Sequence, residues 1–326
     1  MPQYNDKPSL SCALDAILSL QDYFCEIIIC DDCSTDDSWD LLQEYASRYP
    51  VIRLIRNSRN QGVLMTLDRL LSEAKGEYVV MPAADDIWIP ENMKKLLEAI
   101  PIHPECQLFC GQNLVNNRVT NTQYNYSYTF RLSDGKHEAH SISRFYRWLP
   151  WGPAGVIFRD KDRIRSLLKK LAYLKCHADG IAALIYAEQA PFYYSSQPVA
   201  MFTVDGNQFS AGYNNKQYQF DFFTHLFKIL KSDYLSLYSQ MAAANLFYSY
   251  PWVSSFLICH PGVWDRHTVR IIISCNHLFT KFRYSFLPGL FSENFKHKFR
   301  KFRNLIFGIP RDYPAELDNK QDTHLK

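Results

Sequence analysis

Short apolar runs alternate with longer amphipathic stretches through the first hundred residues. The runs are rich in β-branched residues, which is typical of strands buried in a parallel sheet. The longer stretches repeat apolar residues at helical spacing, and Pro90 stands where the first turn of a helix tolerates proline. This alternation predicts right-handed βαβ units, and hence an α/β, Rossmann-like, mostly parallel sheet flanked by helices. We expect strands at 26–30, 51–56 and 77–84, and helices at 35–49, 63–75 and 90–99.

Three residues at the edges of these segments predict where helices begin and end. Ser34 has the side chain of a helix N-cap, and Asp37 follows three residues later as the acidic partner of a capping box. Gly76 stands at the C′ position of a helix over 63–75, where a residue in the left-handed conformation commonly ends a helix. The first helix is therefore predicted to start directly after Ser34.

The alternation becomes irregular beyond residue 107. A strand is predicted at Val156–Phe158, a helix at Ile181–Gln189 and a further strand at Phe192–Ser195. After Ala211 the chain is mostly aromatic-rich helix. We therefore expect an α/β domain over residues 1–212 and a helical, aromatic-rich C-terminal region over 213–326.

Two pairs of aspartates, Asp31-Asp32 and Asp85-Asp86, directly follow predicted strands. Ligands of such sheets bind at the carboxyl ends of the strands, so both pairs lie at the expected binding edge. Carboxylate oxygens suit a divalent cation that bridges two phosphates, and they also accept hydrogen bonds from a base or a ribose. The alternative for each pair is a structural one, in which the aspartates only shape a turn or cap a helix.

The order of these motifs resembles the family 2 glycosyltransferases of the GT-A fold. The resemblance is dense over residues 2–100 and thinner over 150–212. The segments that carry it are Pro2-x-Tyr4-Asn5, Ile29–Ser38, Asn60-Gln61-Gly62-Val63, Ala74–Tyr78, Ala84-Asp85-Asp86 and Pro90.

The resemblance implies an enzyme that takes a sugar from a nucleotide-diphosphate sugar, of the UDP or dTDP type, and inverts the anomeric carbon by direct displacement. It implies Mg²⁺ or Mn²⁺ at Asp85 and Asp86, with Asp85 also near the ribose. It implies that Asp32, with Asp31, holds the nucleoside. The other donor-site residues that it implies are Pro2, Tyr4, Asn5, Asn60, Gly62 and Ala84.

An inverting transfer also needs a general base on the acceptor side. The segment 174–180, followed by a predicted helix, resembles the family segment that ends in an acidic base, and this implies Asp179. The alternative is that Asp179 caps the helix. His177 lies nearby, but a single histidine is more often a polar surface or hydrogen-bonding residue than a base.

Three features depart from the family pattern. The resemblance implies a strand of about half a dozen apolar residues before Pro2, whereas only Met1 precedes Pro2 here. Ala83 stands where the family often has the first aspartate of Asp-x-Asp, and Gly180 follows the proposed base where an aromatic is frequent. The short amino terminus and Ala83 favour the alternative function, a non-catalytic nucleotide-sugar-binding or scaffolding relative of the same fold, whereas Gly180 bears on the acceptor side.

Charge adds one feature to this picture. Seven basic residues and one acid give residues 281–303 a charge of +6, against +3 for the whole chain. Within them, 295–306 have the pattern of a basic amphipathic helix, which either lies on an anionic membrane surface or packs on the core. Because the rest is net acidic, no nucleic acid is expected as a partner.

The chain opens without a signal peptide, and its nine cysteines are scattered. We therefore expect a cytoplasmic protein, in contact with the inner face of the membrane if the basic helix binds it. The acceptor would then be a saccharide or a lipid-linked glycan in surface polysaccharide biosynthesis.

Overall fold

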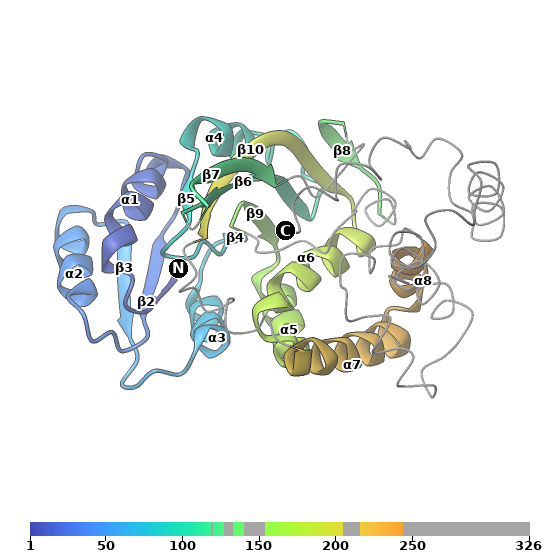
Figure 1. Cartoon of the computed structure of the whole chain (residues 1–326). Helices are drawn as coiled ribbons and strands as arrows, with labels where there is room; N and C mark the ends of the chain where they lie inside the picture. The colour runs from blue at the N-terminus through green and yellow to red at the C-terminus, as the bar shows by residue number, and fades with distance from the viewer. Residues whose placement is uncertain (119, 127–132, 140–153, 205–215, 244–326) are drawn as a thin grey trace, which may run out of the picture. The chain divides into compact units, whose positions relative to one another are not determined.

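The computed structural model describes residues 1–118, 120–126, 133–139, 154–204 and 216–243 (Figure 1). The chain divides into two compact units, Met1–Leu237 and Tyr238–Lys326, and both sheets lie in the first. The predicted domain boundary near Gly212 and the predicted basic helix at 295–306 lie outside the described residues.

The first sheet is small and parallel, and its strands come from the first sixty residues (Figure 1). Its order is β1-β2-β3, with Pro2 opposite Cys30 and Ile27 opposite Ile52. The two strands predicted at 26–30 and 51–56 are confirmed as β2 and β3. The elements of this part are β1 (Pro2–Gln3), α1 (Lys7–Leu18), a 3-10 turn (Gln21–Tyr23), β2 (Ile27–Asp31), α2 (Ser38–Arg48), β3 (Ile52–Arg56) and α3 (Val63–Glu73).

The second sheet has seven strands in the order β4-β9-β6-β10-β5, with β7 beside β6 and β8 beside β10. Only the central β6–β10 pair is parallel, and the other pairings in this sheet are antiparallel. The predicted mostly parallel arrangement therefore holds for the first sheet, whereas the second sheet is mixed. Its strands are β4 (Tyr78–Val80), β5 (Ile87–Trp88), β6 (Leu108–Asn117), β7 (Thr122–Tyr126), β8 (Gly135–His137), β9 (Val156–Arg159) and β10 (Phe192–Val204).

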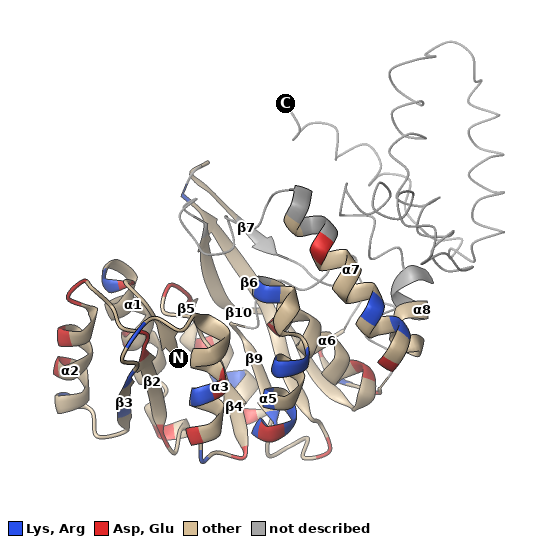
Figure 2. Ribbon diagram, turned by 90° about the horizontal axis from the view of Figure 1, so that it is seen from below, with Lys and Arg blue, Asp and Glu red and all other residues tan. Residues whose placement is uncertain are grey.

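Helices from the second half of the first unit pack beside this sheet. Helix α5 runs along α3, and Arg165 joins the two helices by an ion pair to Asp68, with Nε 2.5 Å from Oδ1 (Figure 2). The hydrogen bond from Arg165 lowers the pKa of Asp68. The remaining helices are α4 (Pro90–Glu98), α5 (Lys161–Lys170), a 3-10 helix (Ala172–His177), α6 (Ala178–Gln189), α7 (Lys216–Asp233) and α8 (Leu235–Ala243).

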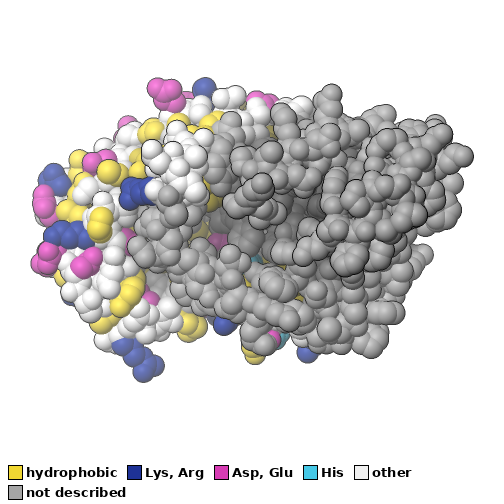
Figure 3. All heavy atoms as spheres, viewed as in Figure 1, with side chains coloured by type: hydrophobic (Ala, Val, Ile, Leu, Met, Phe, Trp, Pro, Cys, Tyr) yellow, Lys and Arg dark blue, Asp and Glu magenta, His cyan; other side chains and the backbone are white. Residues whose placement is uncertain are grey.

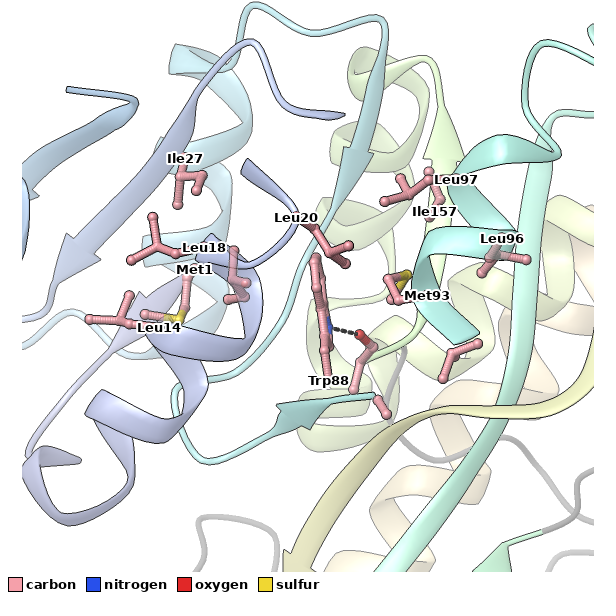
Figure 4. Packing of buried hydrophobic residues seen from close by; sticks show 14 of the residues in the cluster. Met1, Leu14, Leu18, Leu20, Ile27, Trp88, Met93, Leu96, Leu97 and Ile157 are labelled. Carbon is pink, nitrogen blue, oxygen red and sulfur yellow. Dashed lines mark hydrogen bonds between the residues drawn. The ribbon is translucent and has the colours of Figure 1, made fainter. Parts of the chain in front are cut away.

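The core of the first unit is apolar and joins both sheets to α1 and α4. Trp88 lies at its centre, 2% exposed, and its indole N–H donates to the carbonyl of Ala154 at 2.8 Å (Figure 4). That hydrogen bond satisfies the indole's polar group inside the core. Leu14 of α1 and Met93 of α4 are fully buried in the same cluster.

Two of the predicted helix ends are wrong. Helix α2 begins at Ser38, because the amide of Ser34 instead donates to the carboxylate of Asp31 at 3.2 Å and its hydroxyl donates to Gln3 Oε1 at 3.0 Å. Helix α3 ends at Glu73, and its C-cap residue Ala74 is already extended. Gly76 therefore does not cap the helix.

The surface of the described residues is mixed in charge. Acidic and basic side chains intermingle over the part of the face in Figure 3 that these residues form. Among the helices of the described residues, none has the length and the apolar character needed to cross a membrane.

Candidate active site

Asp31 ends strand β2 and is completely buried. Its carboxylate pairs with Nε of Arg56, 3.0 Å away at the end of β3, and accepts a hydrogen bond from the amide of Ser34. The guanidinium of Arg56 also lies over the ring of Trp39, 4.8 Å from its centre, and donates to the carbonyl of Ser34 at 3.1 Å. Asp31 therefore links the ends of β2 and β3 to the turn that follows β2.

Asp32 fixes a different loop, the one that leads into α3. One of its oxygens, Oδ1, accepts from Asn57 Nδ2 at 2.7 Å and from the amide of Gln61 at 2.9 Å. The other oxygen accepts from the amide of Gly62 at 2.8 Å. Because Asp32 is only 4% exposed, its negative charge depends on these three donors for stabilisation.

Asn57 extends this network towards α3. Its side-chain amide donates to Asp32 and to the hydroxyl of Thr66, and its Oδ1 accepts from Arg69 at 2.5 Å. Both polar atoms of its side chain thus have partners although it is buried. Asn57 was not among the residues predicted from the sequence, because a single asparagine after a strand reads as a turn residue.

Gly62 and Asn60 shape the start of α3. Gly62 is the N-cap of the helix and has a φ of 84°, a left-handed conformation that favours glycine. Its amide is also 3.0 Å from Asn60 Oδ1. Both predicted residues therefore lie in the loop held by Asp32. Their contact with a nucleotide-sugar substrate stays a prediction.

The end of β1 meets the turn after β2. Asn5 has a φ of 56°, and its side-chain oxygen accepts from the amide of Thr35 at 2.8 Å, while its own amide donates to the hydroxyl of Ser34 at 3.0 Å. Pro2 lies in β1 itself, and Tyr4 is 42% exposed. The structure thus brings the three residues predicted at the amino end to the same sheet edge as Asp31.

Asp85 and Asp86 lie between β4 and β5, directly after the buried Ala84. The pKa of Asp86 is raised well above its usual range, mainly because burial disfavours its charge. The negative charge of Asp85 raises it further, and Asp179 and Asp6 contribute in the same direction. Several carboxylates therefore lie close enough to repel one another. Asp6 was missed by the sequence reasoning, although it directly follows the Pro2–Asn5 motif.

Asp179 occupies the first turn of α6. Its carboxylate accepts from the amide of Gly180 at 2.6 Å, and burial raises its pKa to about 6. His177, the residue before the helix, is 6% exposed, and its ring packs edge-on against Phe222 at 4.6 Å. Burial lowers the pKa of His177 to about 3, so it is a neutral core residue.

The acidic residues are brought together from distant parts of the chain. Asp6 precedes α1, Asp85 and Asp86 follow β4, and Asp179 begins α6. Within the described ranges, no group of three or more histidine, cysteine, aspartate or glutamate side chains is placed to hold a metal ion.

Comparison with known proteins shows the family to which this chain belongs. The sequence profile described as "Glycosyl transferase family 2" matches residues 1–172, which is more than half of the chain. The chain belongs to glycosyl transferase family 2.

Relatives in this family match about a third of the chain or less. EpsE of Bacillus subtilis (strain 168), named as a candidate glycosyltransferase, is 32% identical over 106 residues, which is 32% of this chain and 38% of EpsE. WfaP of Escherichia coli, a UDP-Glc:alpha-D-GlcNAc-diphosphoundecaprenol beta-1,3-glucosyltransferase, is 35% identical over 86 residues, or 26% of this chain and 34% of WfaP. The chain thus matches less than half the length of either relative.

A solved structure extends the likeness over most of the chain. Residues 1–349 of S. aureus TarS, crystallised in complex with UDP-GlcNAc, superpose with a TM-score of 0.60 over 86% of this chain and 90% of that one. The sequences are 17% identical, so this likeness concerns the fold. Together with the family it confirms the predicted GT-A fold.

Proposed function

We propose that this family 2 chain is an inverting glycosyltransferase that moves a sugar from a uridine-diphosphate sugar to a saccharide or lipid-linked acceptor. The observation that carries the proposal is that Asp85 and Asp179 lie close enough to Asp86 to raise its pKa. Their charges affect one another across a site built from residues almost a hundred positions apart. Structural turn chemistry explains each aspartate singly, but it does not explain why like charges lie together at a partly buried place.

Asp179 serves as the general base in this proposal. With a pKa of about 6, it is mostly ionised at neutral pH and still basic enough to take a proton from an acceptor hydroxyl. Its position in the first turn of α6 also favours the charged form, because the amino end of a helix carries positive partial charge. The hydroxyl, once deprotonated, attacks the anomeric carbon as the diphosphate leaves from the opposite side.

Asp85 and Asp86 fit a divalent cation in their chemistry. Carboxylate oxygens are the ligands that Mg²⁺ and Mn²⁺ prefer, and these ions usually take further oxygens from a substrate's phosphates. Burial and then the charge of Asp85 raise the pKa of Asp86, and a bound cation would favour its ionised form. When bound, such an ion would neutralise the charge of the leaving diphosphate.

The donor end of the site is formed by the turns that Asp31, Asp32 and Asn5 hold. A carboxylate has about four lone-pair positions, so Asp32 can accept another donor besides the three it has. Asp32 can therefore accept a hydrogen bond from N3–H of the uracil base while it still holds the loop before α3. The names of WfaP and of the TarS complex support a uridine donor and, for WfaP, a lipid-linked acceptor.

Such an acceptor would place the reaction at the cytoplasmic face of a membrane. Binding of an anionic membrane through residues 295–306 remains part of this proposal.

A donor screen tests the proposal. UDP-, dTDP- and GDP-sugars are assayed for hydrolysis and transfer with Mn²⁺, with Mg²⁺ and with EDTA. We expect turnover of a UDP-sugar that EDTA abolishes. Asp179→Asn should lower kcat by about 10²–10⁴-fold, and Asp85→Ala should remove the response to metal, whereas the matched variant Asp40→Asn, on the exposed side of α2, should behave as wild type. Protein that binds no donor by calorimetry and turns none over would refute the proposed enzyme.

A further inference from the structure

A line of hydrogen bonds leads from the exposed face of α3 to the buried carboxylate of Asp32. The guanidinium of Arg69, an exposed residue of α3, donates to Asn57 Oδ1 at 2.5 Å. The side-chain amide of Asn57 then donates to Asp32 Oδ1 at 2.7 Å. Asn57 and Asp32 are only 3% and 4% exposed. One buried side chain therefore joins an exposed positive charge to a residue of the proposed nucleotide site.

The side-chain amide of Asn57 has one orientation that satisfies both of these neighbours. An arginine side chain has only N–H donors, so it requires the oxygen of Asn57. A carboxylate has only acceptor oxygens, so Asp32 requires the NH₂ group. The hydroxyl of Thr66, 3.2 Å from Asn57 Nδ2, can donate or accept and does not select between the two orientations. Arg69 and Asp32 together therefore fix the amide.

The backbone around Asn57 is held separately from its side chain. Its backbone amide donates to the carbonyl of Asp31 at 2.8 Å, which continues the pairing of β2 with β3. Arg69 also donates to the carbonyl of Arg56, the last residue of β3, at 3.1 Å. With the backbone held in this way, a half-turn of the side-chain amide is the change that loss of Arg69 would permit. The oxygen of Asn57 would then face Oδ1 of Asp32, and two acceptors would repel each other.

The two oxygens of Asp32 differ in how fully they are used. Oδ1 accepts from Asn57 and from the amide of Gln61 at 2.9 Å, so both of its lone pairs are occupied. Among the described residues Oδ2 accepts from the amide of Gly62 alone, at 2.8 Å, and it keeps one lone pair. The next N–H group that reaches this carboxylate therefore binds at Oδ2.

We propose that Arg69 is a positioning residue for nucleotide binding, which acts through Asn57 on Asp32. By holding the oxygen of Asn57, it keeps the NH₂ group on Oδ1 and leaves Oδ2 turned towards the N–H of the base. This role rests on the proposed function, which places the base at Asp32. Without Arg69 the amide turns over, the carboxylate is pushed out of place, and the nucleotide binds more weakly.

Two substitutions of Arg69 test the orientation of the amide. Lysine has only donors, as arginine does, so Arg69→Lys keeps the oxygen of Asn57 on its side. Glutamine both donates and accepts, so Arg69→Gln fits either orientation. Arg48→Gln, at an exposed position of α2, is the matched control. The full-length proteins are titrated with UDP and Mn²⁺ by calorimetry, and kcat and KM are measured for a UDP-sugar.

We expect Arg69→Gln to raise the Kd of UDP and the KM by about tenfold, with kcat changed by less than about twofold. Arg69→Lys should stay within about threefold of the wild type, and Arg48→Gln should match it. In an Asn57→Ala background, Arg69→Gln should have no further effect, because the connecting side chain is already gone. Equal Kd values for the wild type and Arg69→Gln overturn the proposal. An undiminished effect in the Asn57→Ala background also overturns it, since Arg69 would then act by its charge alone.

A wild type that binds no UDP refutes the proposed nucleotide site instead. The orientation of the amide is then measured without a nucleotide, by hydrogen exchange of the Asn57 side-chain NH₂ group. Exchange should be at least about tenfold faster in Arg69→Gln than in Arg69→Lys, because only the glutamine lets the NH₂ group leave Asp32. Equal exchange rates in the two variants would show that Arg69 does not orient the amide.

Discussion

Replacing Asp32 by asparagine tests whether this residue holds the loop that leads into α3. The side chain keeps its shape, but it loses its charge and exchanges one acceptor oxygen for an NH₂ donor. In the wild type both oxygens face donors, from Asn57 and Gln61 on one side and Gly62 on the other. One orientation of the new amide therefore points N–H groups at Gly62, and the other points them at Asn57 and Gln61.

The expected cost follows from these contacts. Hydrogen bonds to a charged group contribute about 1.5–3 kcal/mol each, and a buried donor left without a partner costs about 1–3 kcal/mol. Asp32→Asn keeps part of the network, in its better orientation, so we expect it to lower the free energy of unfolding by about 2–4 kcal/mol. For a domain of this size that corresponds to a Tm lower by roughly 5–15 °C.

Thermal and urea unfolding of both proteins measure the effect, with Asp40→Asn as the matched control because Asp40 is an exposed residue of α2. The control should change stability by less than about 0.5 kcal/mol. A double-mutant cycle with Asn57→Ala should show coupling of about 0.5–3 kcal/mol, since the two side chains share a hydrogen bond. If Asp32→Asn unfolds like Asp40→Asn, the loop does not depend on this carboxylate and the reasoning fails.

Four further predictions concern Asp179, His177 and Gly111. Because Asp179 must be ionised to act as a base, kcat should fall as pH decreases through about 6, its folded pKa, and a flat profile from pH 5 to 8 would contradict that role. The same raised pKa means that the folded state binds more protons than the unfolded state between about 4 and 6, so Asp179→Asn should reduce the loss of stability as pH rises through this window. The pKa of His177 is lowered to about 3, so between about pH 3 and 6.5 the unfolded state binds a proton that the folded state does not. The free energy of unfolding of the wild type should therefore fall as pH drops below about 6.5. The Tm of His177→Gln should depend less on pH, and Tm values of both proteins over the same pH series check this. A Cβ at Gly111 would lie 2.5 Å from Cγ1 of Val199, so Gly111→Ala should cost about 1–3 kcal/mol in urea unfolding, and Val199→Ala in the same chain should recover part of it.

The sequence by itself determined β2, β3, α3 and α4 among the elements of the first hundred residues, whereas α1 was not predicted. The β-branched runs of β2 and β3 and the helical spacing of α3 are local patterns, and each pattern matches the structure it forms. The order of the motifs was enough to identify the family and the GT-A fold, which the comparisons confirm. The predicted positions of the acidic pairs after β2 and β4 follow from the same alternation.

Tertiary structure decided what local patterns do not encode. Strand β6 was not predicted, because half of its residues are polar or glycine and it is stabilised by β9, β10 and β7 on either side. Ser34 has the residue type of a cap, but it forms hydrogen bonds with the Asp31 carboxylate and Gln3 instead, so the helix begins at Ser38, three residues later than predicted.

The partners of the site residues also depended on tertiary structure. Asp32 accepts hydrogen bonds from amides twenty-nine and thirty positions away, and the pKa of Asp86 is raised by its neighbour Asp85 and also by Asp179 and Asp6, which lie far from it in the sequence. The sequence therefore located the acids, whereas their burial, protonation and neighbours arise from contacts between distant segments. Such contacts depend on how complete sheets and helices pack, and no short stretch of residues determines that packing.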